Sequence, residues 1–166
     1  HRIIAGQATA ALELLEEVPD LDVVVAPVGG GGLLSGTALT VKFLRPGARV
    51  IGAEPAQADD AAASFKAGQI VSRPINTVAD GLRTLLGDRT FPIIRDRVDG
   101  IETVSEAGIV AAMRRIWEVM KIIVEPSGAV PLAVVHEHAA AFAGQRVGLI
   151  LSGGNVDLDT LPWLKR

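Results

Sequence analysis

Four consecutive glycines, Gly29, Gly30, Gly31 and Gly32, followed by Leu33, are the residues of this sequence best suited to binding a ligand through the backbone. Glycine allows neighbouring N–H groups to turn toward one point, where the N-terminus of a following helix adds partial positive charge. A phosphate group is the natural ligand of such a loop, and a tight turn alone needs fewer glycines. The run is not a Walker loop, because no Lys-Ser or Lys-Thr follows it, and a serine replaces the third glycine of the dinucleotide pattern G-x-G-x-x-G.

A second candidate segment, Ser152-Gly153-Gly154-Asn155, ends the last predicted strand. Its glycines would let a ligand come close to the backbone, and its serine would present a hydroxyl at the edge of the sheet. The same residues could also form an ordinary turn. Ligand binding is favoured because this segment would share one sheet edge with the four glycines.

An acidic cluster contains Glu54, Asp59 and Asp60, with no histidine or cysteine beside it. Oxygen donors of this kind suit a hard cation such as Mg²⁺ or Ca²⁺. Two other interpretations remain open. An acidic helix N-terminus, favoured by the helix dipole, would explain Asp59 and Asp60. Glu54 also stands where the ribose-binding acid of a nicotinamide-binding domain would lie.

Short apolar runs alternate with helical patterns along the chain, which predicts an α/β domain with a mainly parallel sheet and helices on both faces. Because ligands bind beyond the carboxyl ends of such strands, the glycines, Glu54, Glu125 and Ser152 are expected at one edge. The predicted strands are 23–28, 50–53, 101–104 and 147–151, and the predicted helices are 8–18, 33–44, 59–67, 106–120 and 128–143, with 69–92 irregular.

Length and composition limit the classes of protein. The 166 residues suit one domain, and 49% hydrophobic with 21% charged residues is typical of neither a disordered nor a membrane-spanning chain. A net charge of -3 argues against nucleic-acid binding. The absence of cysteine excludes disulfides, thiolate catalysis and iron–sulfur clusters. Without a basic and apolar leader, a cytoplasmic location is expected.

Taken together, the motifs resemble those of a known family. The chain resembles the carboxy-terminal part of the large, cofactor-binding domain of the pyridoxal-phosphate enzymes that include serine/threonine dehydratases and serine racemases. This family has the fold type II architecture, like the tryptophan synthase beta subunit. The segments that match in order and spacing are Ile4–Gln7, Pro27–Leu33, Glu54-Pro55, Ala79–Gly81, Val124–Ala129 and Leu151–Asn155.

The resemblance implies roles around pyridoxal 5'-phosphate. Backbone N–H groups of Gly29–Leu33 would hold the cofactor phosphate, and Ser152 would hydrogen-bond the pyridine nitrogen. Asn155 belongs to the same cofactor-binding segment. Glu125 would lie near the ring and Gly81 near its phenolic oxygen. A neutral hydroxyl at the ring nitrogen suits β-elimination.

Two further sites are implied by the resemblance. Thr84 would lie on the substrate side. Racemase-like members bind a divalent cation at the spacing of Glu54, Ala58 and Asp60, so that these residues are the predicted ligands of Mg²⁺, or of Ca²⁺ or Mn²⁺.

The family's Schiff-base lysine and its small domain have no counterpart here, because none of the four lysines, Lys42, Lys66, Lys121 and Lys165, has the required sequence context. The chain alone is therefore expected to be inactive, to need the amino-terminal half of the enzyme or a companion chain, and to expose apolar surface. The parent protein is expected to be a homo-oligomer, such as a dimer.

The predicted function of the parent is an ammonia-lyase that removes the α-proton and the β-hydroxyl of serine, threonine or 3-hydroxyaspartate. The products would be a keto acid and ammonia. Serine racemisation is the first alternative. A non-catalytic module that binds a phosphorylated ligand is the second, and a nicotinamide-binding domain is the least favoured.

Overall fold

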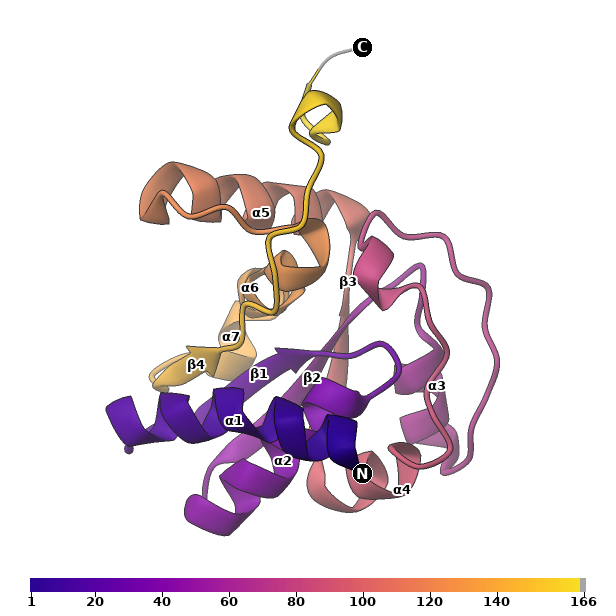
Figure 1. Cartoon of the computed structure of the whole chain (residues 1–166), viewed down its shortest axis with the longest axis vertical. Coiled ribbons are helices and arrows are strands. Elements are labelled where there is room, and N and C mark those ends of the chain that lie inside the picture. The colour runs from indigo at the N-terminus through magenta and orange to yellow at the C-terminus, as the bar shows by residue number, and fades with distance from the viewer. Residues whose placement is uncertain (165–166) are drawn as a thin grey trace.

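A four-stranded parallel sheet in the order β3-β2-β1-β4 forms the centre of the computed structural model, which describes residues 1–164 (Figure 1). Its register pairs Val23 with Arg49 on one side of β1 and with Val147 on the other. All carboxyl ends of the strands therefore lie at one edge, as the sequence predicted. The strands are β1 Val23–Pro27, β2 Arg49–Pro55, β3 Gly100–Val104 and β4 Val147–Leu149.

Helices cover both faces of this sheet, with α1 and α2 on one side and α5 and α6 on the other (Figure 1). This arrangement confirms the predicted α/β architecture. The helices are α1 Arg2–Glu17, α2 Gly32–Leu44, α3 Asp60–Ala67, α4 Phe91–Arg97, α5 Glu106–Met120, α6 Pro126–Glu137 and α7 Ala139–Phe142. Single 3-10 turns lie at Asp80–Leu82 and Leu158–Thr160.

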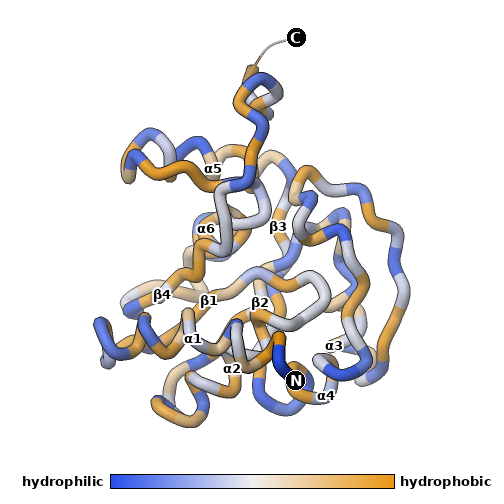
Figure 2. The backbone as a smooth tube through the Cα atoms, in the orientation of Figure 1, coloured by the Kyte–Doolittle hydropathy of each residue, from blue (hydrophilic) through white to orange (hydrophobic). Residues whose placement is uncertain are grey.

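The central strand β1 is buried on both faces, because successive side chains of a strand point in opposite directions. Val24 and Ala26 pack into the core under α1 and α2, whereas Val23 and Val25 pack into the core under α5 and α6. Helices α1 and α5 each bury one apolar face, and Figure 2 shows hydrophobic and hydrophilic segments along α5. Burial on both faces explains why the sequences of these strands are uninterrupted runs of apolar residues.

The structure corrects several predicted boundaries. The first helix begins at Arg2 rather than Ala8, and the predicted helix 128–143 is two helices, α6 and α7, that meet at His138. Helix α4 was missed, because Pro92 was interpreted as a break. Proline is tolerated in the first turn of a helix, where its missing N–H would have no partner.

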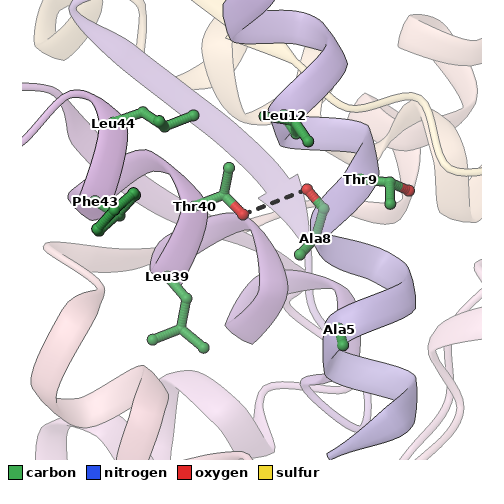
Figure 3. Close-up of a pocket in the computed structure, with 8 residues that line it drawn as sticks. All are labelled: Ala5, Ala8, Thr9, Leu12, Leu39, Thr40, Phe43 and Leu44. Carbon is green, nitrogen blue, oxygen red and sulfur yellow. Dashed lines mark hydrogen bonds between the residues drawn. The ribbon is translucent and has the colours of Figure 1, made fainter.

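Helices α1 and α2 lie very close together. A Cβ atom added at Gly36 would lie 2.6 Å from the carbonyl oxygen of Ile4, so that only glycine fits there. Beside this contact the two helices form an apolar groove of about 400 Å³ that contains Leu12 and Phe43 (Figure 3). Phe43 is 84% exposed, in agreement with the predicted exposed apolar surface.

None of the helices in residues 1–164 combines the length and apolar character needed to cross a lipid bilayer.

Candidate functional site

The four-glycine loop leaves a row of backbone amides unpaired. The first hydrogen bond of α2 runs from the amide of Ser35 to the carbonyl of Gly31, at 2.9 Å. Within the described chain, the amides of 29–34 donate no hydrogen bond. Gly31 has φ +83°, in the left-handed region that favours glycine. The loop therefore offers several N–H donors at a helix N-terminus, as an anion site requires.

A cavity of about 270 Å³ opens beside this loop, at the carboxyl edge of the sheet. Its polar groups are free amides, the Glu125 carboxylate and the hydroxyls of Ser127 and Ser152. The lining residues that were predicted as cofactor contacts are Gly29, Gly30, Gly31, Gly32, Leu33, Gly81, Glu125 and Ser152. The other lining residues are Pro27, Leu82 and Ser127. The structure thus brings together segments that are far apart in sequence.

Two predicted residues do not line this cavity. Thr84 is exposed beside the loop, where a Cβ atom added at Gly30 would lie 3.2 Å from its hydroxyl oxygen. Asn155 is also exposed, and its amide donates to Glu125. The substrate-side role of Thr84 and the cofactor role of Asn155 therefore stay predictions.

Glu125 organises the segment that carries Ser152. Its carboxylate oxygen Oε2 accepts the amide of Asn155 at 2.9 Å, and its own amide donates to the carbonyl of Gly153 at 3.1 Å. A Cβ atom at Gly153 would lie 2.9 Å from Oε1 of Glu125, so the carboxylate rests against the backbone. The glycines of this segment therefore allow Glu125 to hold it from two sides.

We expect Glu125→Ala to increase hydrogen exchange of the Asn155 amide by about tenfold, because a hydrogen bond to a charged acceptor is lost. The expected increase is no larger than about tenfold because the hydrogen bond between Asn155 and Glu125 is exposed to solvent. NMR-detected exchange measures it directly. Glu118→Ala is the matched control, since Glu118 pairs with Arg114 on the exposed face of α5. Equal exchange of Asn155 in all three proteins would contradict this role of Glu125.

Ser127 was not predicted as a site residue. It is 2% exposed, and its hydroxyl oxygen accepts the amide of Gly81 at 3.0 Å. Its hydroxyl hydrogen has no acceptor among the described residues, so it is free to serve a ligand. No sequence signal marks this contact, because Ser127 and Gly81 meet only in the folded chain.

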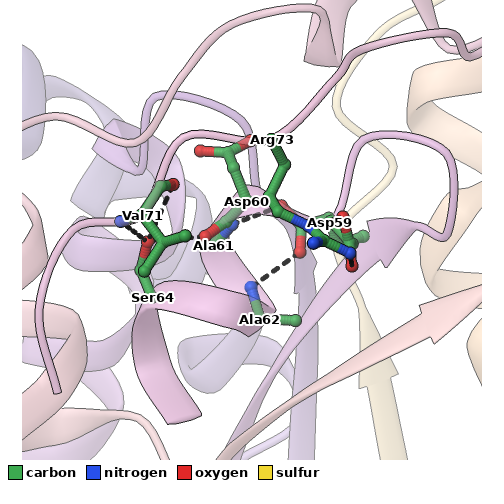
Figure 4. A network of polar contacts seen from close by, with 8 residues as sticks. Asp59, Asp60, Ala61, Ala62, Ser64, Val71 and Arg73 are labelled. Atoms are coloured by element: carbon green, nitrogen blue, oxygen red, sulfur yellow. Dashed lines mark hydrogen bonds and ion pairs between the residues drawn. The ribbon is translucent and has the colours of Figure 1, made fainter. Parts of the chain in front are cut away.

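The acidic cluster lies at the start of α3, where Asp59 is placed beside Arg73 (Figure 4). Glu54 is 1% exposed, and its two oxygens accept the amides of Ala61 and Ala62, each at 2.8 Å. It thus caps α3, a role the sequence did not reveal. Burial raises the pKa of Glu54 to about 8, and the nearby carboxylate of Asp60 acts in the same direction.

The two aspartates of the cluster have different environments. Asp60 is 1% exposed and accepts the amide of Leu86 at 2.7 Å, and burial raises its pKa. Asp59 pairs with Arg73 at 3.0 Å, and this hydrogen bond lowers its pKa. The helix dipole alone therefore does not account for the cluster, because each acid has a specific partner.

Glu54 and Asp60 are both buried, and neither carboxylate forms an ion pair with a cationic side chain among the described residues. Each oxygen of Glu54 keeps a second lone pair beyond its bond to an amide. Residues 1–164 contain no group of three or more His, Cys, Asp or Glu side chains placed to hold a metal ion. A cation here would thus need a backbone oxygen, and the predicted set of Glu54, Ala58 and Asp60 stays a prediction.

A parallel α/β domain with free amides beyond the central strand defines a class of proteins that bind phosphorylated ligands at the sheet edge. Residues 1–153 match the family model "Pyridoxal-phosphate dependent enzyme". The chain belongs to this family of pyridoxal-phosphate-dependent enzymes, and the resemblance seen in its motifs is confirmed.

Individual relatives are similar over nearly the whole chain. The beta-hydroxyaspartate dehydratase of Paracoccus denitrificans is 56% identical over 98% of this chain and 52% of its own length. The serine racemase of Arabidopsis thaliana is 49% identical over 96% of this chain and 50% of its own. The crystal structure of the T.th. threonine deaminase superposes with a TM-score of 0.89 and 53% identity, over 93% of this chain and 58% of that one. The chain thus spans about half the length of the curated relatives it matches.

Proposed function

We propose that this chain is the carboxy-terminal part of the cofactor-binding domain of a pyridoxal-phosphate-dependent ammonia-lyase. The whole enzyme would act on serine, threonine or 3-hydroxyaspartate and release a keto acid and ammonia. The observation that carries the proposal is the row of free amides at 29–33, whose residues line one cavity together with Ser152 and Glu125. The family membership and the dehydratase and deaminase among the relatives support it.

The residues of this chain would bind and orient the cofactor. The glycine-loop amides would hold its phosphate, and the Ser152 hydroxyl would hydrogen-bond the ring nitrogen. Glu125 would keep the segment of Ser152 in place, and Thr84 would contribute to the substrate side. When bound, pyridoxal phosphate supplies the electron sink that lets the α-proton and then the β-hydroxyl of the amino acid leave.

Proton transfer would depend on a lysine from a segment other than this one. Lys42 is ion-paired with Asp99 at 2.7 Å, and no lysine of the described residues lines the cavity. Lys165 lies outside the described residues and lacks the sequence context of the family's lysine. We therefore propose that the chain alone is inactive.

A divalent cation, Mg²⁺ or else Ca²⁺ or Mn²⁺, would bind at Glu54, Ala58 and Asp60. The support is the burial of the two carboxylates and the Coulombic interaction between them. In this place the cation would hold the start of α3 against the segment that begins at Leu86.

The whole protein would include the amino-terminal half of the enzyme or a companion chain, and it would form a homo-oligomer such as a dimer. The apolar groove between α1 and α2 supports a further contact of this kind. The predicted cytoplasmic location stays a prediction.

Serine racemisation is a second candidate function, favoured by the relatives that bear this name. It would begin with the same removal of the α-proton and would differ in the group that returns a proton to the α-carbon. The nicotinamide alternative is disfavoured, because Glu54 is buried and bonded to two amides rather than free to face a ribose.

Ligand addition tests the proposal. We expect pyridoxal 5'-phosphate at about 100 times its Kd to raise the melting temperature by about 5–10 °C, whereas NAD should not. Borohydride treatment followed by mass spectrometry would then show whether the cofactor is fixed on this chain, on a companion chain, or on neither. Reversible uptake without a fixed adduct, even with the companion chain present, would favour the non-catalytic module, and a response to NAD alone would contradict the proposal.

A further inference from the structure

The carbonyl of Gly30, inside the glycine loop, is held by two donors from a distant turn. The hydroxyl of Thr90 donates to it at 2.7 Å, and the amide of Gly87 donates at 3.3 Å. Thr90 also lies 3.0 Å from the carbonyl of Gly87. Since a hydroxyl has one hydrogen, the shorter contact to Gly30 is the stronger of the two.

This contact fixes the orientation of the next amide. A peptide group is planar and trans, so its N–H points away from its C=O. With the Gly30 carbonyl directed at Thr90, the amide of Gly31 must point to the opposite side. Neither glycine has a Cβ atom to resist rotation of this peptide, so an external contact is needed to hold it.

Thr90 is itself firmly placed. It is 9% exposed, and its carbonyl accepts the hydroxyl of Ser35 in the first turn of α2 at 3.4 Å. A Cβ atom added at Gly31 would lie 2.7 Å from the Thr90 hydroxyl oxygen, so the side chain is packed directly against the loop. The turn that precedes it is anchored on α3, where Asp60 accepts the amide of Leu86.

We propose that Thr90 is the positioning residue of the phosphate site. Its hydroxyl would hold the Gly30–Gly31 peptide in the orientation that presents the Gly31 amide to a phosphate group. Thr90 acts through Gly30 and does not contact the ligand. The inference rests on the proposed function, because it assumes that the free amides bind a phosphate.

The test compares Thr90→Val, which removes the hydroxyl at nearly constant shape, with Thr90→Ser, which keeps it. The probes are inorganic phosphate and pyridoxal 5'-phosphate, with dissociation constants from calorimetry. We expect Thr90→Val to bind each of the two probes about tenfold more weakly than the unaltered chain. The dissociation constants of Thr90→Ser should stay within about threefold of those of the unaltered chain. Phosphate should shift the Gly31 amide resonance in the unaltered chain and in Thr90→Ser, but far less in Thr90→Val.

Thr40→Val is the matched control. The hydroxyl of Thr40 donates to the carbonyl of Ala8 at 3.3 Å, on the α1–α2 side of the fold. Thr40→Val should lower the melting temperature about as much as Thr90→Val does, but it should leave the affinity for phosphate unchanged. If Thr90→Val fails to fold, Thr90→Ala takes its place under the same criteria.

The outcomes separate the two ideas. If the unaltered chain binds neither probe, the proposed function and the role of Thr90 both fail. If it binds both and Thr90→Val binds equally well, only the role of Thr90 fails. Equal losses in Thr90→Ser and Thr90→Val would also overturn it, because the hydroxyl would then not be the cause.

Discussion

Replacing Gly31 with alanine is expected to abolish phosphate and cofactor binding and to lower the melting temperature by about 5–15 °C. Gly31 has φ +83°, where an alanine costs about 1–2 kcal/mol. The new Cβ atom would lie 2.7 Å from the hydroxyl oxygen of Thr90, 2.8 Å from Ile94 and 2.9 Å from Leu86. Overpacking of this kind adds about 1–3 kcal/mol. The three neighbours would push the loop out of the shape that gathers its amides.

Gly47→Ala is the matched control for this prediction. Gly47 has no atom within 4 Å of an added Cβ and no positive φ, so its replacement should change neither property. Calorimetric titration with pyridoxal 5'-phosphate and differential scanning calorimetry give the two readouts. A Gly31→Ala chain that binds the cofactor with unchanged affinity would show that the loop does not form the site.

The architecture and most of the cavity could be predicted from sequence, because both follow from local patterns. Uninterrupted apolar runs predicted the strands, and the parallel connection of those strands placed the glycine loop, Glu125 and Ser152 at one edge. A run of four glycines indicates a ligand-binding loop from the sequence alone, since an ordinary turn needs fewer glycines. The structure therefore brings the predicted residues of these segments together at one edge of the sheet.

The contacts that orient these residues could not be predicted. Thr90 meets Gly30, and Ser127 meets Gly81, only because the fold brings together residues that are far apart in sequence. A threonine or serine hydroxyl can bond to many kinds of group, so the residue type alone does not predict its partner. Glu54 was assigned to a cation or a ribose, whereas the structure adds a capping role toward α3 that depends on where that helix begins.

The acidic cluster and the glycine loop contact one common segment, which begins at Leu86. Asp60 holds the amide of Leu86 at 2.7 Å, and the residues that follow Leu86 hold the carbonyl of Gly30. A group that stabilises the carboxylate of Asp60 should therefore also stabilise the support of the glycine loop. This connection makes the cluster the second place where a large effect is expected.

Mg²⁺ at about 100 times its Kd is expected to raise the melting temperature of the chelator-treated chain by about 5–10 °C, because a ligand of the native state adds about 2.7 kcal/mol at this ratio. The physical reason is that Glu54 and Asp60 are each 1% exposed, and that burial and the charge of Asp60 raise the pKa of Glu54. A cation bound to both carboxylates would favour their charged forms and would therefore oppose the rise in the pKa of Glu54. Ca²⁺ and Mn²⁺ are measured in parallel, and NaCl of equal ionic strength excludes general screening.

Glu54→Gln should remove this response, because the amide side chain loses the charge and one of the two acceptor oxygens. The matched control is Glu118→Gln, since Glu118 is exposed and pairs only with Arg114 in the described part of the chain. The control should retain the full shift, and the Leu86 amide resonance should move with Mg²⁺ in the control but not in Glu54→Gln. A melting temperature that does not depend on divalent cations, or an equal response in both variants, would mean that the two buried carboxylates serve only to cap α3 and to hold Leu86.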